Sequence, residues 1–328
     1  MATSTAATGA ARRAALLVIP TLVLALALRG SGAAGAGGGD CHFPAVFNFG
    51  DSNSDTGGLS SLFGAAPPPN GRTFFGMPSG RYCDGRLVID FIGGIYRELL
   101  PRAEYFSQAL YTFDIGQNDI TSSYFVYNTT EEVEATIPDL MERLTSVIQS
   151  VYMRGGRYFW IHNTGPIGCL PYALLHRPDL ATPTDDAGCS VTYNKVAQLF
   201  NLRLKETVAS LRKTHPDAAF TYVDVYTAKY KLISDAKKLG FDDPLLTCCG
   251  HGGGRYNFDL SIGCGGKKEV NGTSVVVGNS CADPSKRVSW DGVHFTEAAN
   301  KFVFDQIVAG ALSDPPVPLK RACQSKGR

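Results

Sequence analysis

The sequence predicts a single α/β domain built on a parallel β-sheet. Short apolar segments alternate along the chain with longer segments that carry apolar residues at helical spacing. The short segments are apolar on both faces, which is typical of strands covered by helices on each side. Glycine and small polar residues follow these strands, as they do at the functional edge of a parallel sheet. With 328 residues and 44% apolar composition, the chain can bury one large core.

The expected elements follow one another in a regular order. Strands are expected at residues 45–49, 111–116, 157–162 and 220–225. Helices are expected at residues 87–100, 103–110, 130–153, 192–213 and 297–312, with Thr130 as the N-cap of the third. Two glycine-rich stretches separate them: residues 57–85, expected to form one rim of a cleft, and residues 244–284, expected to be an irregular loop held by disulfides.

The N-terminus has the pattern of a signal peptide. Arg12 and Arg13 precede an apolar run at residues 14–28, and small residues fill positions 30–39. The run holds 15 residues and includes Pro20, so it is short for a membrane-spanning helix of about 20 residues. We therefore expect no integral membrane segment once the signal peptide has been removed.

This pattern divides the chain into a leader, residues 1–39, and one domain, residues 40–328. Cleavage at residues 34–39 would leave 28 basic and 30 acidic residues, a net charge near −2. Such a balance does not favour binding to nucleic acid or to an anionic membrane. We expect a secreted protein of the extracellular space or cell wall. The oligomeric state is left open.

The cysteines and glycosylation sequons agree with export. Nine cysteines are expected to be mostly paired in an oxidising compartment, and the odd number leaves at least one unpaired. The short segment between Cys169 and Cys189 favours a disulfide there. Asn128 and Asn271 begin the two sequons. A cluster in the glycine-rich loop lacks the paired spacing of a zinc site, so no metal is expected; it comprises Cys248, Cys249, His251, Cys264 and Cys281.

The first strand ends in Gly50-Asp51-Ser52, which could present Ser52 as a nucleophile. On these residues alone a simple turn is favoured, because Gly, Asp and Ser are common turn residues. The spacing of Asp291 and His294 would let the carboxylate orient the imidazole as a base, although Asp291 could equally start a helix. Asn118 follows the second strand and could donate a hydrogen bond to an oxyanion, or be a turn asparagine. At the end of the third strand, His162 is expected to be a structural histidine with its hydrogen bonds satisfied.

Three ordered motifs, Gly50-Asp51-Ser52, Gly116-Gln117-Asn118-Asp119 and Asp291-Gly292-Val293-His294, together resemble the GDSL esterase/lipase family of the SGNH hydrolases. The resemblance extends over most of the domain and is greatest to the secreted plant branch with the early-nodulin-type esterases. It implies a flavodoxin-like three-layer α/β/α sandwich with a parallel sheet, and no cofactor.

The resemblance also implies the roles of the site residues. Ser52 would be the nucleophile and, through its backbone N–H, one oxyanion donor. Asn118 would be the second donor, His294 the base and Asp291 the group that orients it. The implied reaction is hydrolysis of acyl or acetyl esters, of lipids or of cell-wall carbohydrates, through an acyl-enzyme. The family usually has serine at the position of Cys83, which is therefore the candidate for the unpaired thiol.

One interval departs from the family pattern. The family's second motif, a glycine that completes the oxyanion hole, lies on a strand-loop unit that has no counterpart near residues 93–102. We therefore expect the sheet to lack one edge strand and the activity to be impaired. Two alternatives stay open: a non-catalytic relative that binds glycan or acyl ligands, and a glycosidase, for which Asp51 and Asp291 would be the carboxylates.

Overall fold

The computed structural model describes residues 24–27, 39–58, 60, 66–93 and 103–324. Within these residues a six-stranded sheet has the order β1-β2-β3-β4-β5-β10. Its four central strands are parallel: β2 (Ala45–Gly50), β3 (Leu110–Asp114), β4 (Tyr158–His162) and β5 (Ala219–Val223). They are the four strands predicted from the sequence, and the mainly parallel sheet is confirmed.

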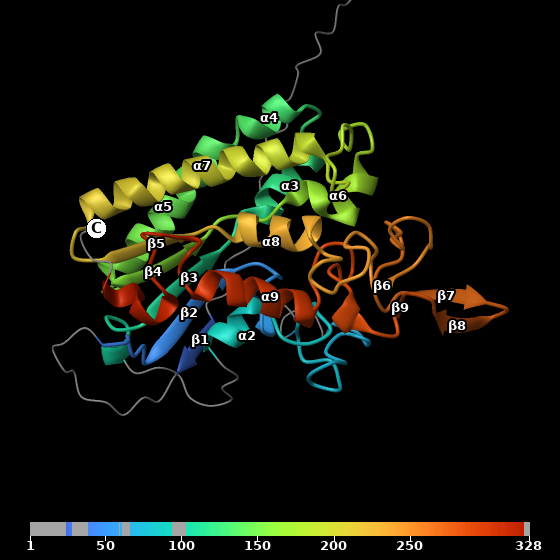
Figure 1. Cartoon of the computed structure of the whole chain (residues 1–328), viewed down its shortest axis with the longest axis horizontal. Coiled ribbons are helices and arrows are strands. Elements are labelled where there is room, and N and C mark those ends of the chain that lie inside the picture. The colour runs from blue at the N-terminus through green and yellow to red at the C-terminus, as the bar shows by residue number, and fades with distance from the viewer. Residues whose placement is uncertain (1–23, 28–38, 59, 61–65, 94–102, 325–328) are drawn as a thin grey trace, which may run out of the picture.

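Helices form a layer on each side of this sheet (Figure 1). One layer contains α2 (Val88–Gly93), α8 (Val225–Ser234) and α9 (Glu297–Val308), with α9 in contact with the other two. The other contains α4 (Thr130–Glu134), α5 (Ile137–Met153) and α7 (Val191–Thr214), with α7 in contact with the other two. The architecture is the expected α/β/α sandwich.

Aromatic side chains fill the core across the parallel strands. Phe159 and Phe220 are directly opposite in the register of β4 and β5, and their rings stack at a centroid distance of 4.6 Å. Phe113 of β3 continues the row, 6.4 Å from Phe159. All three side chains are almost completely buried. Burial of each such ring contributes about 2 to 3 kcal/mol, so this row anchors the sheet whose ends carry the functional residues.

The remaining elements are short. Two further helices are α3 (Gln117–Val126) and α6 (Pro171–His176). Turns of 3-10 helix occupy Ala103–Tyr105, Ile167–Cys169, Pro284–Lys286 and Leu319–Gln324. The short strands outside the main sheet are β6 (Cys249–Gly250), β7 (Lys267–Val270), β8 (Thr273–Val276) and β9 (Asn279–Ser280). Strands β7 and β8 form a hairpin that projects at the right of Figure 1.

Two predicted helices differ from the structure. In residues 103–110 only Ala103–Tyr105 form a 3-10 turn, because Leu110 already belongs to buried strand β3. Residues 130–153 form two helices rather than one, because α5 restarts after Thr136 with a proline in its first turn. The N-cap is Thr129 rather than Thr130, and Thr129 forms a reciprocal capping box with Glu132.

The edge of the sheet beside β2 also differs from the expectation. Strand β1 (Leu24–Ala27) pairs with β2 in antiparallel orientation, from Leu24 opposite Asn48 to Ala27 opposite Ala45. The predicted missing edge strand is thus replaced by four residues of the predicted leader. The interval was predicted to be missing near residues 93–102, and residues 94–102 lie outside the described residues, as does the rest of the predicted leader before residue 39.

Four disulfides hold the described part of the chain. Cys169 pairs with Cys189, the pair favoured by the sequence. Cys41–Cys323 joins the segment before β2 to the C-terminal turn, and two disulfides hold the glycine-rich loop, Cys248–Cys281 and Cys249–Cys264. Cys83 is unpaired, as expected, and it is buried.

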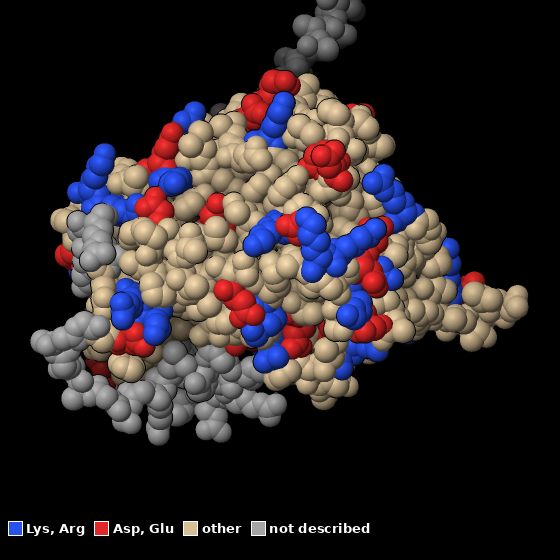
Figure 2. Space-filling view, viewed as in Figure 1, with Lys and Arg blue, Asp and Glu red and all other residues tan. Residues whose placement is uncertain are grey.

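Charges are interspersed on the surface shown in Figure 2, where neither sign forms an extended field. Among the described residues, no helix combines the length and apolar character needed to cross a membrane. The β7–β8 hairpin projects beyond the body of the molecule and carries few charged groups on this face. Asn271 lies at its turn and is exposed.

Candidate active site

Ser52 lies in a tight turn at the carboxyl end of β2. The Asp51 backbone N–H donates to the Asp114 carbonyl at the end of β3, 3.3 Å away, and the Asp51 carbonyl accepts from the Ser54 N–H at 3.0 Å. A side chain at Gly50 would meet the Ser54 hydroxyl at 1.8 Å, so the turn requires glycine at that position. The turn leaves Ser52 partly exposed at the edge of the sheet.

Asp291 and His294 form a second turn that precedes α9. Oδ1 of Asp291 accepts the backbone N–H groups of Val293 at 3.1 Å and His294 at 2.8 Å. Its second oxygen, Oδ2, lies 2.6 Å from Nδ1 of His294. The three-residue spacing therefore lets one carboxylate hold both the backbone and the ring of the histidine.

The two turns meet through one hydrogen bond. Nε2 of His294 lies 2.7 Å from Oγ of Ser52, on the opposite side of the imidazole from Asp291. A neutral imidazole that donates Nδ1–H to the carboxylate has a free lone pair on Nε2, which can accept the serine proton. The arrangement of Ser52, His294 and Asp291 is that of a nucleophile, a base and an orienting acid.

The electrostatics of the pair favour an ionised Asp291. Burial disfavours its carboxylate, but the charge and hydrogen bonds of His294 outweigh burial and lower the pKa of Asp291. Burial likewise disfavours the imidazolium, but the charge and hydrogen bond of Asp291 raise the pKa of His294. An imidazole with a raised pKa is a stronger base for the serine proton, and it loses that role at a higher pH as the solution is acidified.

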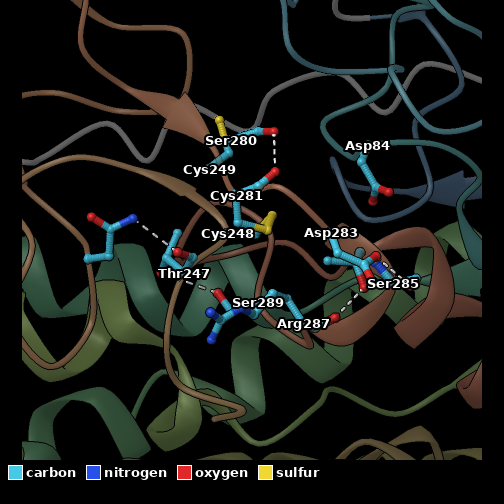
Figure 3. Close-up of a disulfide and its surroundings, with 12 residues drawn as sticks. Asp84, Thr247, Cys248, Cys249, Ser280, Cys281, Asp283, Ser285, Arg287 and Ser289 are labelled. Carbon is cyan, nitrogen blue, oxygen red and sulfur yellow. Dashed lines mark hydrogen bonds between the residues drawn. A yellow bond between two sulfur atoms is a disulfide. The ribbon is translucent and has the colours of Figure 1, made fainter. Parts of the chain in front are cut away.

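The glycine-rich loop at residues 244–284, which two disulfides close, supports the backbone around His294. The N–H groups of Cys248 and Cys249 donate to the carbonyls of Ser289, at 3.0 Å, and Trp290, at 2.6 Å. The Trp290 N–H in turn donates to the His294 carbonyl at 2.8 Å. Figure 3 shows Thr247 and Ser289 beside the Cys248–Cys281 disulfide, with their hydroxyls 3.5 Å apart. His294 is therefore supported by a loop that disulfides close.

The loop at residues 66–86 covers one face of the His294 ring. The ring of Tyr82 stacks on the His294 imidazole, with centroids 5.6 Å apart and an interplanar angle of 26°. Asp84 accepts the first N–H of α9, from Glu297, at 2.7 Å, and so joins the loop to the helix. The expectation that residues 57–85 line a cleft did not identify either contact, because neither has a short-range sequence signal.

Asn118 lies in the first turn of α3 rather than at the strand tip, and its side chain is exposed. Within the described residues its amide makes no hydrogen bond, as is also true of the Ser52 backbone N–H. The element that carries Asn118 begins three residues after β3, the immediate neighbour of β2. Both groups therefore keep a donor available near the functional edge of the sheet.

His162 differs from its expected role as a satisfied structural histidine. Its side chain is 4% exposed, and its Nδ1 lies 4.0 Å from Oδ2 of Asp114. Its Nε2 is buried without a hydrogen-bond partner in the described structure. The sequence around His162 is apolar, which favoured a buried histidine with both ring nitrogens hydrogen-bonded. In the described structure only Nδ1 approaches a partner.

The remaining candidates from the sequence are the sequon at Asn128 and the possible metal ligands of the glycine-rich loop. Asn128 is exposed just before α4, as a glycosylation acceptor must be. Among the described residues, no group of three or more His, Cys, Asp or Glu side chains could hold a metal ion. In the glycine-rich loop the four cysteines that were weighed as ligands form disulfides, and His251 contacts Lys268.

Comparison with known proteins adds the family. Residues 93–307 match the family described as GDSL-like Lipase/Acylhydrolase. The maize protein named GDSL esterase/lipase ACHE is 73% identical, over 90% of this chain and 92% of its own length. The Arabidopsis thaliana protein named Alpha-L-fucosidase 3 is 44% identical, over 87% and 93%. The Medicago truncatula protein named GDSL esterase/lipase ENOD8 is 40% identical, over 88% and 91%.

The alignment with the maize relative is longer than this chain. It runs over 366 positions, whereas 90% of 328 residues is about 295, so about 70 positions have no residue of this chain opposite them. At this coverage the aligned span includes Ser52. A shortened interval agrees with these lengths, and its position between residues 93 and 102 stays a prediction. By its family match and these identities, the chain belongs to the GDSL-like lipase/acylhydrolase family and is a carboxylic ester hydrolase.

Proposed function

We propose that Ser52 attacks the carbonyl carbon of an ester and becomes acylated. His294 Nε2 takes the proton from Ser52 Oγ as the new C–O bond forms, and then gives it to the departing alkoxide when the ester bond breaks. A water molecule, deprotonated by His294, then attacks the acyl-serine, releases the acid and restores the hydroxyl. The observation that carries this proposal is the pair of hydrogen bonds from His294 to Ser52, 2.7 Å, and to Asp291, 2.6 Å.

The proposed oxyanion hole contains the Ser52 backbone N–H and the Asn118 side-chain amide. Both donors are unoccupied by described residues. The glycine N–H of the family's second motif would be the third donor, and the short interval before residue 103 leaves no place for it. One lost oxyanion donor costs about 100- to 1,000-fold in turnover. We therefore propose a slow esterase rather than a fully active one.

The proposed substrates are acyl or acetyl esters of lipids or of cell-wall carbohydrates, met outside the cell. A secreted route is supported by the leader pattern at residues 1–39, by four disulfides and by the exposed sequons at Asn128 and Asn271. Relatives named esterase/lipase support the ester class without specifying the acid or the alcohol.

The proposal is tested by active-site labelling. A fluorophosphonate should label the purified protein at Ser52, and the Ser52→Ala variant should not be labelled. Ser150→Ala, which alters an exposed serine on α5, is the matched control and should label as the unchanged protein does. A folded, unlabelled sample that still binds acyl ligands would favour the non-catalytic alternative.

A glycosidase is the second candidate, because one relative carries the name Alpha-L-fucosidase 3. Asp51 and Asp291 are the available carboxylates, and burial with the nearby charge of Asp114 raises the pKa of Asp51 to about 6. A raised pKa suits a general acid. However, Asp291 is held by His294 and two backbone N–H groups and has no free oxygen aimed at a sugar. Release of p-nitrophenol from an aryl fucoside, unchanged by Ser52→Ala, would favour this candidate.

A further inference from the structure

Tyr82 places an aromatic ring on His294. The half-buried ring stacks on the imidazole, with centroids 5.6 Å apart and an interplanar angle of 26°. Within the described residues the Tyr82 hydroxyl makes no hydrogen bond. The contact with His294 is therefore made by the ring, and the hydroxyl has no part in it.

The residue before Tyr82 is fixed by a buried ion pair. Arg81 donates its Nε–H to Oδ2 of Asp90, 2.8 Å away, and an Nη2–H to Oδ1 at 2.6 Å. Both side chains are almost completely buried. Nη1 of Arg81 also donates to the carbonyls of Ser79, at 2.9 Å, and Thr56, at 3.3 Å. Two parallel hydrogen bonds fix the orientation of a guanidinium as well as its distance, so the backbone beside Tyr82 is firmly placed.

The residues after Tyr82 are joined to α9, the helix that follows the histidine turn. Oδ1 of Asp84 accepts the N–H of Glu297 at 2.7 Å. Arg86 donates its Nε–H and an Nη2–H to Oε1 of Glu297, at 2.9 Å and 2.6 Å. The loop is therefore anchored on both sides of Tyr82, and one of these anchors is the helix whose start positions His294.

The proposed reaction makes His294 positively charged. Its Nε2 takes the proton of Ser52 Oγ across the hydrogen bond of 2.7 Å, so an imidazolium forms in the transition state. The face of an aromatic ring attracts a cation within about 6 Å of its centroid, and the attraction grows when water is excluded. His294 is only 9% exposed, so little water competes. The ring of Tyr82 thus lies where it interacts more strongly with the imidazolium than with the neutral imidazole.

We propose that Tyr82 is a positioning residue of the reaction: its aromatic face orients the His294 ring and stabilises the imidazolium that forms as Ser52 loses its proton. Asp291 holds the imidazole at its edge, through Nδ1, and Tyr82 holds it at its face. The inference rests on the proposed function, because Tyr82 acts through His294. Its contribution is to the transition state rather than to binding of the ester.

The first experiment titrates His294 by NMR and needs no turnover. In Tyr82→Leu the pKa of His294 should fall by about 0.5 to 1 unit, because the imidazolium loses the aromatic face. If Tyr82 served only to exclude water, the pKa would rise instead, because a more open site disfavours the imidazolium less. Tyr82→Phe keeps the ring and should titrate as the unchanged protein does. The His294 signal is identified by its loss in His294→Gln.

The charged groups that act on His294 are the same in all of these variants. They come from three elements: Asp291 from its own turn, Asp51 after β2 and Lys229 from α8. A change in the titration of His294 in Tyr82→Leu would therefore reflect the ring that was removed.

Tyr152→Leu is the matched control. Tyr152 makes an aromatic contact with another histidine, His215, at a centroid distance of 4.3 Å. It stands near the end of α5, where the chain leads into the start of β4, at the edge of the sheet opposite Ser52. Removing this ring should leave both the titration of His294 and the turnover unchanged.

Steady-state kinetics with an activated ester give the second readout. Above the acid limb, kcat should fall about three- to tenfold in Tyr82→Leu, the factor that corresponds to the change in pKa, with a smaller change in KM. Tyr82→Phe should restore kcat. If Tyr82→Leu does not fold, Tyr82→Met replaces it.

A His294 pKa that is unchanged or raised in the folded Leu or Met variant would overturn the inference, and so would an unchanged kcat. Absence of fluorophosphonate labelling at Ser52 would instead refute the proposed function. The titration measures the contact of Tyr82 with His294 without turnover, so the two failures are distinguishable.

Discussion

Ser52 and His294 stand on parts of the molecule that are supported in different ways. The histidine turn is tied to a loop closed by the Cys248–Cys281 and Cys249–Cys264 disulfides, and hydrogen bonds continue from that loop to the His294 carbonyl. The serine turn follows β2, whose inner neighbour is β3 and whose outer neighbour is the four-residue strand β1. Two disulfides lie close to the histidine turn, whereas the disulfide on the serine side, Cys41–Cys323, lies before β2 and so at the other end of the strand from Ser52. The serine turn itself is held by non-covalent pairing at the rim of the sheet.

This difference places the interval that is predicted to be missing on one side of the site. The interval expected to be missing belongs beside β2 and would have supplied both an edge strand and an oxyanion donor. His294, Asp291 and the Cys248–Cys281 disulfide that supports them all lie among the described residues. The family match begins at residue 93, after the serine turn, which agrees with a chain whose later part follows the family pattern more continuously.

The largest effect on turnover is expected on the histidine side of the site, which the disulfides support. His294→Ala removes the group that takes the serine proton, so kcat should fall by about 10⁴-fold or more. Steady-state hydrolysis of p-nitrophenyl acetate measures it. His176→Ala, a histidine of α6 outside the site, should retain full activity. Equal turnover in His294→Ala and the unchanged protein would remove His294 from the mechanism.

The next largest effect on turnover is expected on the serine side, where an edge strand and an oxyanion donor are predicted to be missing. Inserting between Gly93 and Ala103 the stretch that the maize relative has in addition should restore the edge strand and the third donor. Turnover should then rise by about 100- to 1,000-fold with little change in KM, because an oxyanion donor acts in the transition state. The same chimera carrying Ser52→Ala controls for activity from another source. A chimera that folds and turns over no faster would show that the present oxyanion hole is sufficient.

Removing one disulfide from each side should have a smaller effect, which differs between the histidine side and the serine side. The change Cys248→Ala with Cys281→Ala opens a loop of sequence separation 33 and should lower the free energy of unfolding by about 3 kcal/mol. It should also lower kcat, because the loop braces His294. The change Cys41→Ala with Cys323→Ala should lower stability but leave kcat unchanged. Thermal unfolding and kinetics at a temperature where each variant is folded measure both, and equal kcat in the two variants would contradict the bracing.

The smallest effect is a pH dependence of stability at Asp51. Its pKa is raised from 3.8 to about 6 in the folded protein, first by burial and then by Asp114, so folding favours the protonated acid. Stability from this residue is therefore present below pH 3.8 and is lost as the pH rises to about 6. Asp51→Asn should melt at a higher temperature than the unchanged protein at pH 7.5, and the advantage should shrink toward pH 4. A difference in melting temperature that does not change with pH would show that folding does not raise the pKa of Asp51.

The sequence predicted the parts of the molecule that have local signals. The four parallel strands are apolar runs that end at glycine or polar residues, and Asp291 and His294 are close in the chain, so a short turn brings them together. The approach of Ser52 to His294 spans 242 residues and came only from the resemblance. Tyr82 was missed, because its contact with His294 depends on packing between elements that are distant in sequence.

Local patterns were misleading where tertiary burial decided the outcome. Residues 106–109 read as the continuation of a helix, yet the chain must enter the buried strand β3 at Leu110. The run at residues 24–27 read only as part of a leader, and hydrophobicity alone does not distinguish a leader from a sheet edge. His162 read as satisfied because it ends an apolar strand, although hydrogen bonding to its Nε2 depends on neighbours that the sequence does not reveal.

Strand β1 consists of four residues from the segment that the sequence predicts to be a leader. Cleavage at residues 34–39 would separate Leu24–Ala27 from the domain while leaving Cys41 and its disulfide in place. The outer backbone of β2 would then lose its antiparallel partner along the strand that carries the serine. The order of folding and cleavage would therefore matter, because cleavage of the predicted leader would expose the edge of β2 beside Ser52.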